Sequence, residues 1–547
     1  MVIQRTMARA LPLLSNSLGV GLRGRRLVRK SNVTHLTFFL VRAFSSKKKD
    51  GSYFGAIGGD TDEPPPDLTP SQVTSILRRN ERLLINCSPL VSSVETNQLS
   101  SNHPIEDRLR VSRVHASPHV SDSLLVGVFD GHGGGACAEL ISNRLFHYIC
   151  LALSPNPVKF ITEIEPKSFV QNLIYSPKPE AVSPYDQDGR ALVREHVSRN
   201  EEYYLARYAA KLHQQQQNLE SSKSCLNCTQ DKIHDAFVQC DQDLSEEIQY
   251  NLASPEGAAN KSNLLKHYYF SLAVSGCCAN VVVLHDSKLY VANSGDCRAV
   301  MTFQDPSDDL NPLKVLPLSH DHNSDNVSEL KRIFDGHPKQ EQNNIIRYNR
   351  LLGQLMPLRA FGDFGYKWPV STIRAVGLTK AFGPHVIPPF YHTPPYLTAE
   401  PEIITFDLKS LNESTAFLVV ATDGLWEQFA SSREVTDVIW KYQEINRQHN
   451  QSISNSSLEN EDTIDLPPDP DKLDDNEAHL HLELDGNQAT FLLRSSLCQV
   501  TSDYEQSGQS IQELRRMNHN KLVSYLTLPE SVVRNFRDDI SLIVIRF

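Results

Sequence analysis

The chain of 547 residues lacks an apolar run of membrane-spanning length. The run at residues 36–41 is cut short by Arg42. Hydrophobic residues nevertheless make up 40% of the chain and charged residues 22%, which is enough apolar material for a full core and excludes global disorder. The sequence therefore predicts a folded, soluble protein without a transmembrane segment.

Cysteines are few and show no regular spacing, because ten of them are scattered over the whole chain. This pattern excludes a disulfide framework and fits a reducing compartment. Cys225 and Cys228 form a single CxxC without a matching second pair, so we interpret them as loop cysteines rather than as a zinc or redox site. No cysteine lies in the His-Cys-x5-Arg loop of thiol phosphatases, which excludes that chemistry.

Acidic residues are missing from the first 49 positions, which hold seven arginines and four lysines. Removing these eleven positive charges would change the net charge from −11 to about −22. Such an Arg-rich leader is typical of a mitochondrial presequence, and residues 42–45 resemble a matrix-peptidase site that cleaves after Phe44. We therefore predict a presequence over residues 1–44 and a location in the mitochondrial matrix. The alternative is a basic arm for nucleic acid or anionic lipid, but the acidic remainder argues against a nucleic-acid partner.

The stretch 124–134 is an apolar, strand-like run that breaks abruptly into Asp130, Gly131, His132 and further glycines. A buried strand would present Asp130 at its C-terminal end, and the small residues after it would leave the backbone open. A carboxylate, a carbonyl oxygen and an imidazole would then surround one small volume. This predicts a metal and proton-transfer site that needs further ligands.

Two segments far along the chain supply acids in the same manner. An apolar run at residues 416–422 ends in Asp423 and Gly424, and Asp538 and Asp539 lead into an apolar run at residues 540–545. Hard divalent cations such as Mg2+ prefer several oxygen ligands, so converging carboxylates suit them better than they suit zinc. The pattern favours metal-assisted hydrolysis, with a phosphate ester as the expected substrate.

These motifs resemble the PPM family of metal-dependent serine/threonine protein phosphatases. The resemblance follows the family's order, covers roughly the last 480 residues and is far beyond a chance motif match. It runs through residues 105–107, 128–132, 275–276, 293–298, 359–363, 421–424 and 537–539. It implies the α+β class and an αββα sandwich of two packed, mostly antiparallel β-sheets flanked by helices, which the mixture of strands and helices also favours.

The resemblance implies a centre with two Mg2+ or Mn2+ ions. Asp130 would bridge both ions, the carbonyl of Gly131 would bind one of them, and Asp423 and Asp538 would bind the other. Two cations acting on a shared water can produce a hydroxide at neutral pH, and that hydroxide would attack phosphorus without a covalent enzyme intermediate.

Four other residues receive supporting roles from the same resemblance. Glu106 and Asp107 would support the cluster through metal-bound waters. Asp296 would help Asp423 to hold a third, weaker ion. His132 would act as the general acid, because a departing serine alkoxide needs a proton when the P–O bond breaks.

Substrate phosphate recognition differs from the family pattern at one position. Many members carry an arginine four residues before the Glu-Asp pair, where this chain has Asn102. Asn102 can donate a hydrogen bond but carries no charge, so we expect another arginine, such as Arg108, to contact the phosphate.

Residues 352–363 and 391–402 narrow the resemblance to the pyruvate dehydrogenase phosphatases, which share the asparagine. This implies a phosphoserine of pyruvate dehydrogenase as substrate, docking to the lipoyl-bearing acyltransferase core, and a regulatory subunit. It leaves Ca2+ dependence open, and an acidic run at residues 469–475 lacks the glycine and glutamate of an EF-hand loop. The alternatives are another mitochondrial phosphoprotein as substrate, or a catalytically dead scaffold of the same fold.

The spread of the expected site residues determines the domain prediction. Ligands from Asp107 to Asp538 must meet within a few ångströms, which favours one large domain over several. We interpret residues 45–66 as a linker and residues 67–547 as a single phosphatase domain. Polar segments near 176–264 and 447–486 are expected to be insertions.

Overall fold

The computed structural model describes residues 68–114, 122–159, 170–175, 187–219, 228–255, 262–305, 308, 313–411, 415–456, 485–498 and 511–547. All of them belong to the unit Pro65–Phe547. The predicted presequence and linker up to residue 66 lie outside the described residues, as does the acidic run at 469–475.

The described strands form two large sheets and one short hairpin, and each strand pair is antiparallel. The first sheet has the order β1 (Arg82–Ser88), β2 (Val91–Leu99), β15 (Ile540–Arg546), β14 (Ala416–Ala421), β8 (Arg298–Gln304), β9 (Leu313–Pro317). The second has the order β13 (Glu402–Asp407), β7 (Lys288–Ser294), β6 (Gly276–His285), β4 (Ser123–His132), β3 (Arg108–Val114), β5 (Val170–Tyr175), and β12 (Phe361–Gly362) also pairs with β6. The hairpin is β10 (Ile346–Arg347) with β11 (Arg350–Leu351).

The central strands are apolar on both faces because both faces are covered. In β14, Leu418 and Val420 join the core between the sheets together with Val128 of β4. The alternate residues Phe417 and Val419 pack on the other side, in a second core that includes residues of the helices. Successive side chains of a strand point to opposite faces, so a strand buried on both sides must be apolar throughout.

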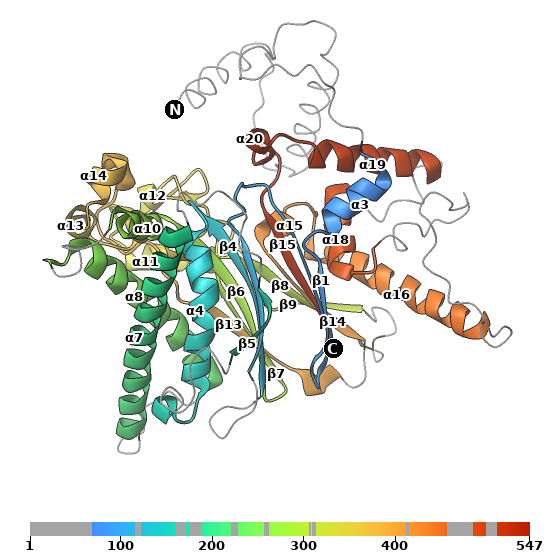
Figure 1. Cartoon of the computed structure of the whole chain (residues 1–547), viewed down its shortest axis with the longest axis horizontal. Helices are drawn as coiled ribbons and strands as arrows, with labels where there is room; N and C mark the ends of the chain where they lie inside the picture. The colour runs from blue at the N-terminus through green and yellow to red at the C-terminus, as the bar shows by residue number, and fades with distance from the viewer. Residues whose placement is uncertain are drawn as a thin grey trace, which may run out of the picture. The chain divides into compact units, whose positions relative to one another are not determined.

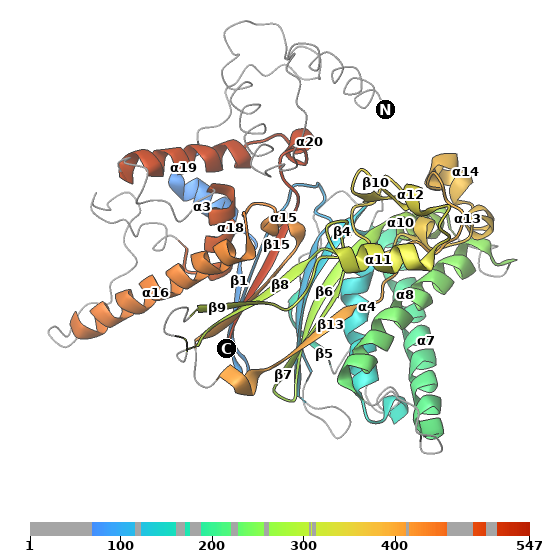
Figure 2. The same cartoon turned by 180° about the vertical axis from the view of Figure 1, so that it is seen from behind.

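Helices cover the outer face of each sheet, which confirms the predicted αββα sandwich (Figures 1 and 2). The second sheet is flanked by α4 (Ala136–Leu153), α7 (Gln187–Leu219), α8 (Thr229–Ala253) and α10 (Asn263–Val274), and the first by α3 (Pro70–Arg78), α16 (Ser432–Ser456), α18 (Gln488–Cys498) and α19 (Ile511–Leu526). Within the described part of the chain, no helix is both long and apolar enough to cross a membrane.

Shorter elements connect these layers. The segment between β9 and β13 contains α11 (Val327–Gly336), α12 (Gln342–Ile345), η1 (Phe364–Tyr366), α13 (Val370–Ala375), α14 (Leu378–Phe382) and η2 (Pro384–Val386). The 3-10 helix η3 (Leu408–Leu411) precedes β14, α15 (Asp423–Trp426) follows it, and α20 (Glu530–Val533) precedes β15.

One of the segments interpreted as an insertion contributes to the core. Helix α8 lies within residues 176–264 and buries Ile233, Phe237 and Leu244 in the main hydrophobic cluster. It packs closely on α4, which in turn packs on β4. The polar composition of the surrounding segment hides this apolar face, so α8 is part of the sandwich and not a polar appendage.

The chain brings its acidic segments to one edge of the sandwich. Strand β4 ends at His132, α15 begins at Asp423 directly after β14, and β15 begins directly after Asp539. These strand ends lie together at the upper edge in Figure 1. The antiparallel register pairs Ala421 with Leu542, so the acids on either side of the β14–β15 pair meet at the same end.

Candidate metal centre and catalytic site

Three carboxylates converge at this edge. Asp130 lies two residues before the end of β4, Asp296 lies in the loop between β7 and β8, and Asp423 begins α15. Each offers an oxygen atom, and these three atoms lie within 4.8 Å of one another. Like charges at this spacing repel strongly, and several carboxylate oxygens around one point are the ligands that hard dications prefer.

The repulsion between the buried carboxylates of this cluster favours the binding of a cation. Burial raises the pKa of Asp130 well above its usual value, and the neighbouring Asp423 and Asp107 raise it further. Burial also raises the pKa of Asp423, again with help from nearby carboxylates. Moreover, Asp423 Oδ1 is buried and has no hydrogen-bond partner among the described residues. An unpartnered, buried carboxylate oxygen facing other acids fits a divalent metal ion.

The Glu106–Asp107 pair lies against the same cluster. A Cβ atom at Gly131 would lie 2.3 Å from the carbonyl oxygen of Glu106, so only glycine permits this approach of the two backbones. Asp107 is buried, and the Thr422 hydroxyl donates a hydrogen bond of 3.0 Å to its Oδ2. The Asp107 carboxylate thus acts on the acidic cluster, and the Glu106 backbone lies against Gly131; both come from the segment that precedes β3.

Asp538 and Asp539, the two acids before β15, have different partners. Asp538 forms an ion pair with Arg534 at the rim of the cluster. Asp539 is buried and accepts hydrogen bonds from the backbone N–H groups of Ser101 (2.5 Å) and Glu106 (2.9 Å). Asp539 therefore ties the Glu106 segment to β15, a role that the sequence analysis missed because its partners are more than 430 residues away.

The residues expected to contact substrate phosphate are engaged with the protein. Asn102 Nδ2 donates to Asp539 Oδ2 at 3.1 Å, so a phosphate contact would require this amide to leave Asp539. The side chain of Arg108 is 4% exposed; its Nε donates to Glu139 Oε2 at 2.8 Å and its Nη1 to the carbonyl of Asp107 at 2.7 Å. A phosphate contact of Arg108 would likewise require its guanidinium to leave Glu139 and the backbone.

His132 is paired with a carboxylate that the sequence analysis did not single out. Its Nε2 lies 2.5 Å from Oδ2 of Asp363, which directly follows β12. Burial alone would lower the pKa of His132, but the charge and hydrogen bond of Asp363 outweigh it and raise the pKa. The imidazole is 23% exposed, so it remains accessible from outside.

A further acid, Glu427, was also missed. It lies four residues after Asp423, and residues at this spacing share one face of a helical turn. Burial raises the pKa of Glu427, and the charges of Asp538 and Asp296 raise it further. The i, i+4 spacing to Asp423 was the available sequence signal.

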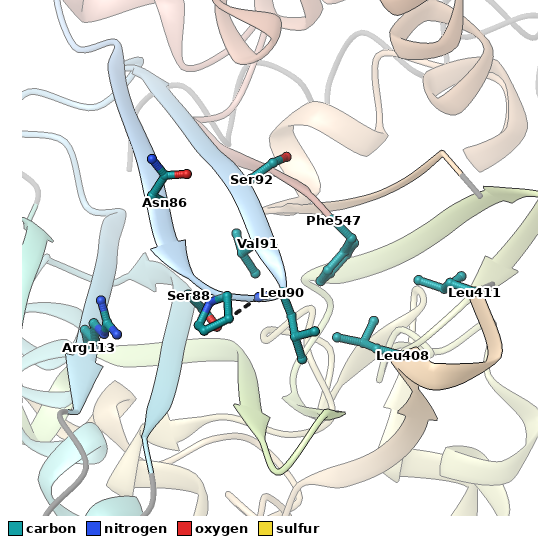
Figure 3. Close-up of a pocket in the computed structure, with 10 residues that line it drawn as sticks. Asn86, Ser88, Leu90, Val91, Ser92, Arg113, Leu408, Leu411 and Phe547 are labelled. Carbon is teal, nitrogen blue, oxygen red and sulfur yellow. Dashed lines mark hydrogen bonds between the residues drawn. The ribbon is translucent and has the colours of Figure 1, made fainter. Parts of the chain in front are cut away.

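The acidic edge is distinct from a hollow on another part of the described structure. A pocket of about 680 Å³ is lined by Asn86, Leu90, Leu408, Leu411, Phe547 and neighbouring residues. Figure 3 shows the side chains of Leu90 and Leu408 pointing toward one another across it. Its lining residue Arg113 pairs with Leu124 near the start of β4, whereas Asp130 lies near the end of that strand. The pocket therefore lies near the opposite end of the strands from the acidic cluster.

Comparisons with known proteins agree with this geometry. Residues 193–460 match the family model of Protein phosphatase 2C. Pyruvate dehydrogenase (acetyl-transferring) phosphatase 1, mitochondrial, of Rattus norvegicus is 33% identical over 504 residues, which cover 88% of this chain and 83% of that protein. The chain belongs to the protein phosphatase 2C family. It is a PPM-type protein serine/threonine phosphatase, in a family that depends on Mg2+ or Mn2+.

Two further relatives give the range of the similarity. Pyruvate dehydrogenase (acetyl-transferring) phosphatase 2, mitochondrial, of Homo sapiens is 31% identical over 506 residues, with 88% of this phosphatase and 83% of the relative covered. A solved structure of the serine-threonine phosphatase 2C from Toxoplasma gondii aligns with 85% of this chain and 98% of its own, at a TM-score of 0.40 and 14% identity. The similarity to the Toxoplasma gondii structure is too low for a comparison of individual residues.

Proposed function

We propose that this phosphatase removes phosphate from serine of the pyruvate dehydrogenase component of the mitochondrial pyruvate dehydrogenase complex, and so reactivates that enzyme. The observation that carries the proposal is the identity of 33% and 31% to two named pyruvate dehydrogenase phosphatases over 88% of the chain. The alignment extends far beyond the catalytic motifs, so it supports a shared substrate more strongly than a match of those motifs alone would.

Two Mg2+ or Mn2+ ions would be held by the acidic edge. We assign Asp130 to both ions, the Gly131 carbonyl to one, and Asp423 and Asp538 to the other. When bound, such ions activate water and neutralise the charge of a phosphate group. The unpartnered Asp423 Oδ1 and the mutual repulsion of the buried acids support this assignment.

A third, weaker ion would share Asp423 with the second ion. Asp296 and Asp423 lie within the same 4.8 Å cluster, and Glu427 interacts electrostatically with Asp296. Glu106 and Asp107 would hold water molecules of the ions rather than the ions themselves, as outer-shell groups do in many metal sites.

The chain's own residues would then complete a direct hydrolysis. A water molecule would attack phosphorus and lose one proton to solvent, the P–O bond to the serine would break, and its electron pair would stay on the serine oxygen. We propose that the imidazolium of His132 gives that oxygen a proton, so that serine and inorganic phosphate leave. Asp130 and the carbonyl of Gly131 would hold the ions, and His132 follows these two residues directly in the chain.

The experiment that tests the substrate is a phosphate-release assay on phosphorylated pyruvate dehydrogenase with Mg2+, Mn2+ or Ca2+. We expect Mg2+- or Mn2+-dependent release from the phosphorylated enzyme that exceeds release from phosphorylated branched-chain ketoacid dehydrogenase. Faster release from the branched-chain enzyme would assign another mitochondrial phosphoprotein. No release from any phosphoprotein or from nitrophenyl phosphate would indicate a catalytically dead scaffold. Release that needs Ca2+ in addition would establish Ca2+ dependence.

We also propose that the phosphatase docks on the lipoyl-bearing acyltransferase core and takes a regulatory subunit, as the resemblance to the pyruvate dehydrogenase phosphatases implies. Co-sedimentation of the purified chain with that core tests the docking, and recovery of the chain entirely in the supernatant would contradict it. The catalytic unit in this proposal is residues 67–547, with the segments near 176–264 and 447–486 as elaborations of one domain.

The predicted presequence specifies the residue at which the mature protein begins. The acid-free first 49 residues and the Phe44–Ser45 bond predict that the mature protein in the matrix begins at or within a few residues of Ser45. N-terminal sequencing of the protein from purified mitochondria measures this. An intact Met1 terminus on a purely cytosolic pool would contradict both the presequence and the matrix location.

A further inference from the structure

Asp363 is held in place by backbone contacts on β6. Strand β12 pairs Gly362 with Gly276, and the N–H of Asp363 donates to the carbonyl of Ser275 at 3.0 Å. Its φ of 50° lies in the left-handed region, which a non-glycine residue adopts at some energetic cost. The surrounding pairing thus keeps a 5% exposed carboxylate in an unfavourable backbone conformation.

Gly276 lies between Asp363 and His132 in the sheet. It pairs with His132 of β4 on one side and with Gly362 of β12 on the other. A Cβ atom at position 276 would lie 2.1 Å from Asp363 Oδ2 and 2.2 Å from His132 Nε2. The carboxylate and the imidazole therefore meet in the space that the missing side chain leaves, and any other residue there would separate them.

We propose that Asp363 is the positioning residue of His132, and that it holds the ring through Nε2–H so that Nδ1 is the nitrogen which protonates the departing serine oxygen. The proposal rests on the proposed function, since it deepens the role of His132 in phosphoserine hydrolysis. It is a statement about which ring nitrogen acts and what fixes the ring.

The contact with Asp363 determines which ring nitrogen of His132 gives up its proton. In the imidazolium both ring nitrogens carry a proton, and Nε2–H donates to Asp363 Oδ2. When the P–O bond breaks, Nδ1 loses its proton to the serine oxygen, and the ring becomes neutral with its remaining proton still on Nε2. Asp363 Oδ2 accepts this hydrogen bond before and after the transfer, so it selects one tautomer of the neutral ring and prevents rotation about the side-chain bonds.

Other groups near the ring do not provide the same restraint. Asp296 and Glu106 act on His132 only through their charges, whereas Asp363 makes the direct contact. Asp241 is a matched buried carboxylate in the same place: its Oδ1 accepts from the N–H of Gly362 at 2.9 Å, and its Oδ2 pairs with Lys367 at 2.7 Å. Asp241 supports the loop that carries Asp363 and does not touch the imidazole, which makes it the natural control.

The kinetic test compares Asp363→Asn with Asp241→Asn on a phosphoserine protein and on nitrophenyl phosphate. An amide cannot replace the carboxylate as a charged acceptor, so Asp363→Asn should lower kcat on phosphoserine by roughly 10-fold or more. The loss on nitrophenyl phosphate, whose leaving group needs little protonation, should be much smaller. Asp241→Asn should change both substrates by one common factor. In a His132→Gln background, Asp363→Asn should add no further loss on phosphoserine.

A second readout needs neither metal nor substrate. In metal-free protein labelled with 15N-histidine, the Nε2–H of His132, assigned by its loss in His132→Gln, should resonate far downfield. It should move upfield in Asp363→Asn and stay in place in Asp241→Asn. Equal kinetic losses on both substrates, or an additive loss in the double variant, would overturn the positioning role. A downfield signal together with full activity of His132→Gln would leave the contact standing but refute the proposed general acid, and with it this inference.

Discussion

Replacement of Asp130 by asparagine should abolish phosphatase activity while leaving the fold intact. The carboxylate is assigned to both ions, whereas the apolar residues of β4 that precede it supply the packing. We therefore expect turnover to fall by far more than the roughly 10²-fold that loss of an outer-shell metal partner costs. Phosphate release at saturating Mg2+ measures this, and near-normal turnover would refute the two-ion assignment.

In the absence of metal, the Asp130→Asn variant should also differ from wild type in its unfolding temperature. Burial and neighbouring acids raise the pKa of Asp130 above its unfolded value, so ionisation at neutral pH destabilises the folded state. Asparagine cannot ionise, and metal-free Asp130→Asn should thus unfold at a temperature higher by on the order of a few °C than wild type. Added Mg2+ should stabilise the wild type and have little effect on the variant.

Asp122→Asn is the matched control for both measurements. Asp122 directly precedes β4 and pairs with Arg113 at 3.1 Å, at the end of the strand remote from the acidic edge. Its substitution should leave turnover and the response to Mg2+ unchanged. A similar loss of activity in Asp122→Asn would show that asparagine at either end of β4 disturbs the sheet rather than the metal centre.

Local patterns were sufficient to predict the elements that build the site. Two β-rich runs at residues 279–284 and 288–293 are separated by the turn residues 285–287, and this pattern predicts the hairpin of β6 and β7. The structure has Asp286 and Ser287 of this turn at positive φ. The helix after the glycine loop follows from apolar residues at i, i+4 and i+8, which α4 buries. Each of these signals is contained in fewer than about 20 residues, so composition and periodicity reveal it.

Contacts between distant segments were not visible in the same way. Nothing near His132 in the sequence indicates that Asp363 lies 2.5 Å from its Nε2, because the pairing of β12 with β6 creates that contact. The direction of the Arg108 side chain was not visible for a related reason. An arginine beside two acids has the right charge for phosphate, but β3 turns its side chain toward Glu139 of α4. The charge of a residue can be read from the sequence, whereas the direction of its side chain depends on the completed sheet.

Replacement of His132 by glutamine should reveal the step that this residue catalyses. If the imidazole protonates the leaving group, turnover on a phosphoserine protein should fall on the order of 10²-fold or more, the usual range for loss of a general acid. Glutamine retains hydrogen-bonding groups of similar reach but cannot deliver a proton at neutral pH. On nitrophenyl phosphate, whose leaving group is already acidic, the loss should be much smaller, provided that bond cleavage limits the rate for both substrates.

His285→Gln is the appropriate control, since His285 lies in the same sheet and its Nδ1 is 2.8 Å from the Ser123 hydroxyl at the opposite end of β4. That variant should retain activity on both substrates. Steady-state kcat values for the two substrates, with each variant, form a direct measure of how much proton transfer contributes. Equal losses on both substrates in His132→Gln would place the imidazole in metal or phosphate positioning instead, because such a role does not depend on the acidity of the leaving group.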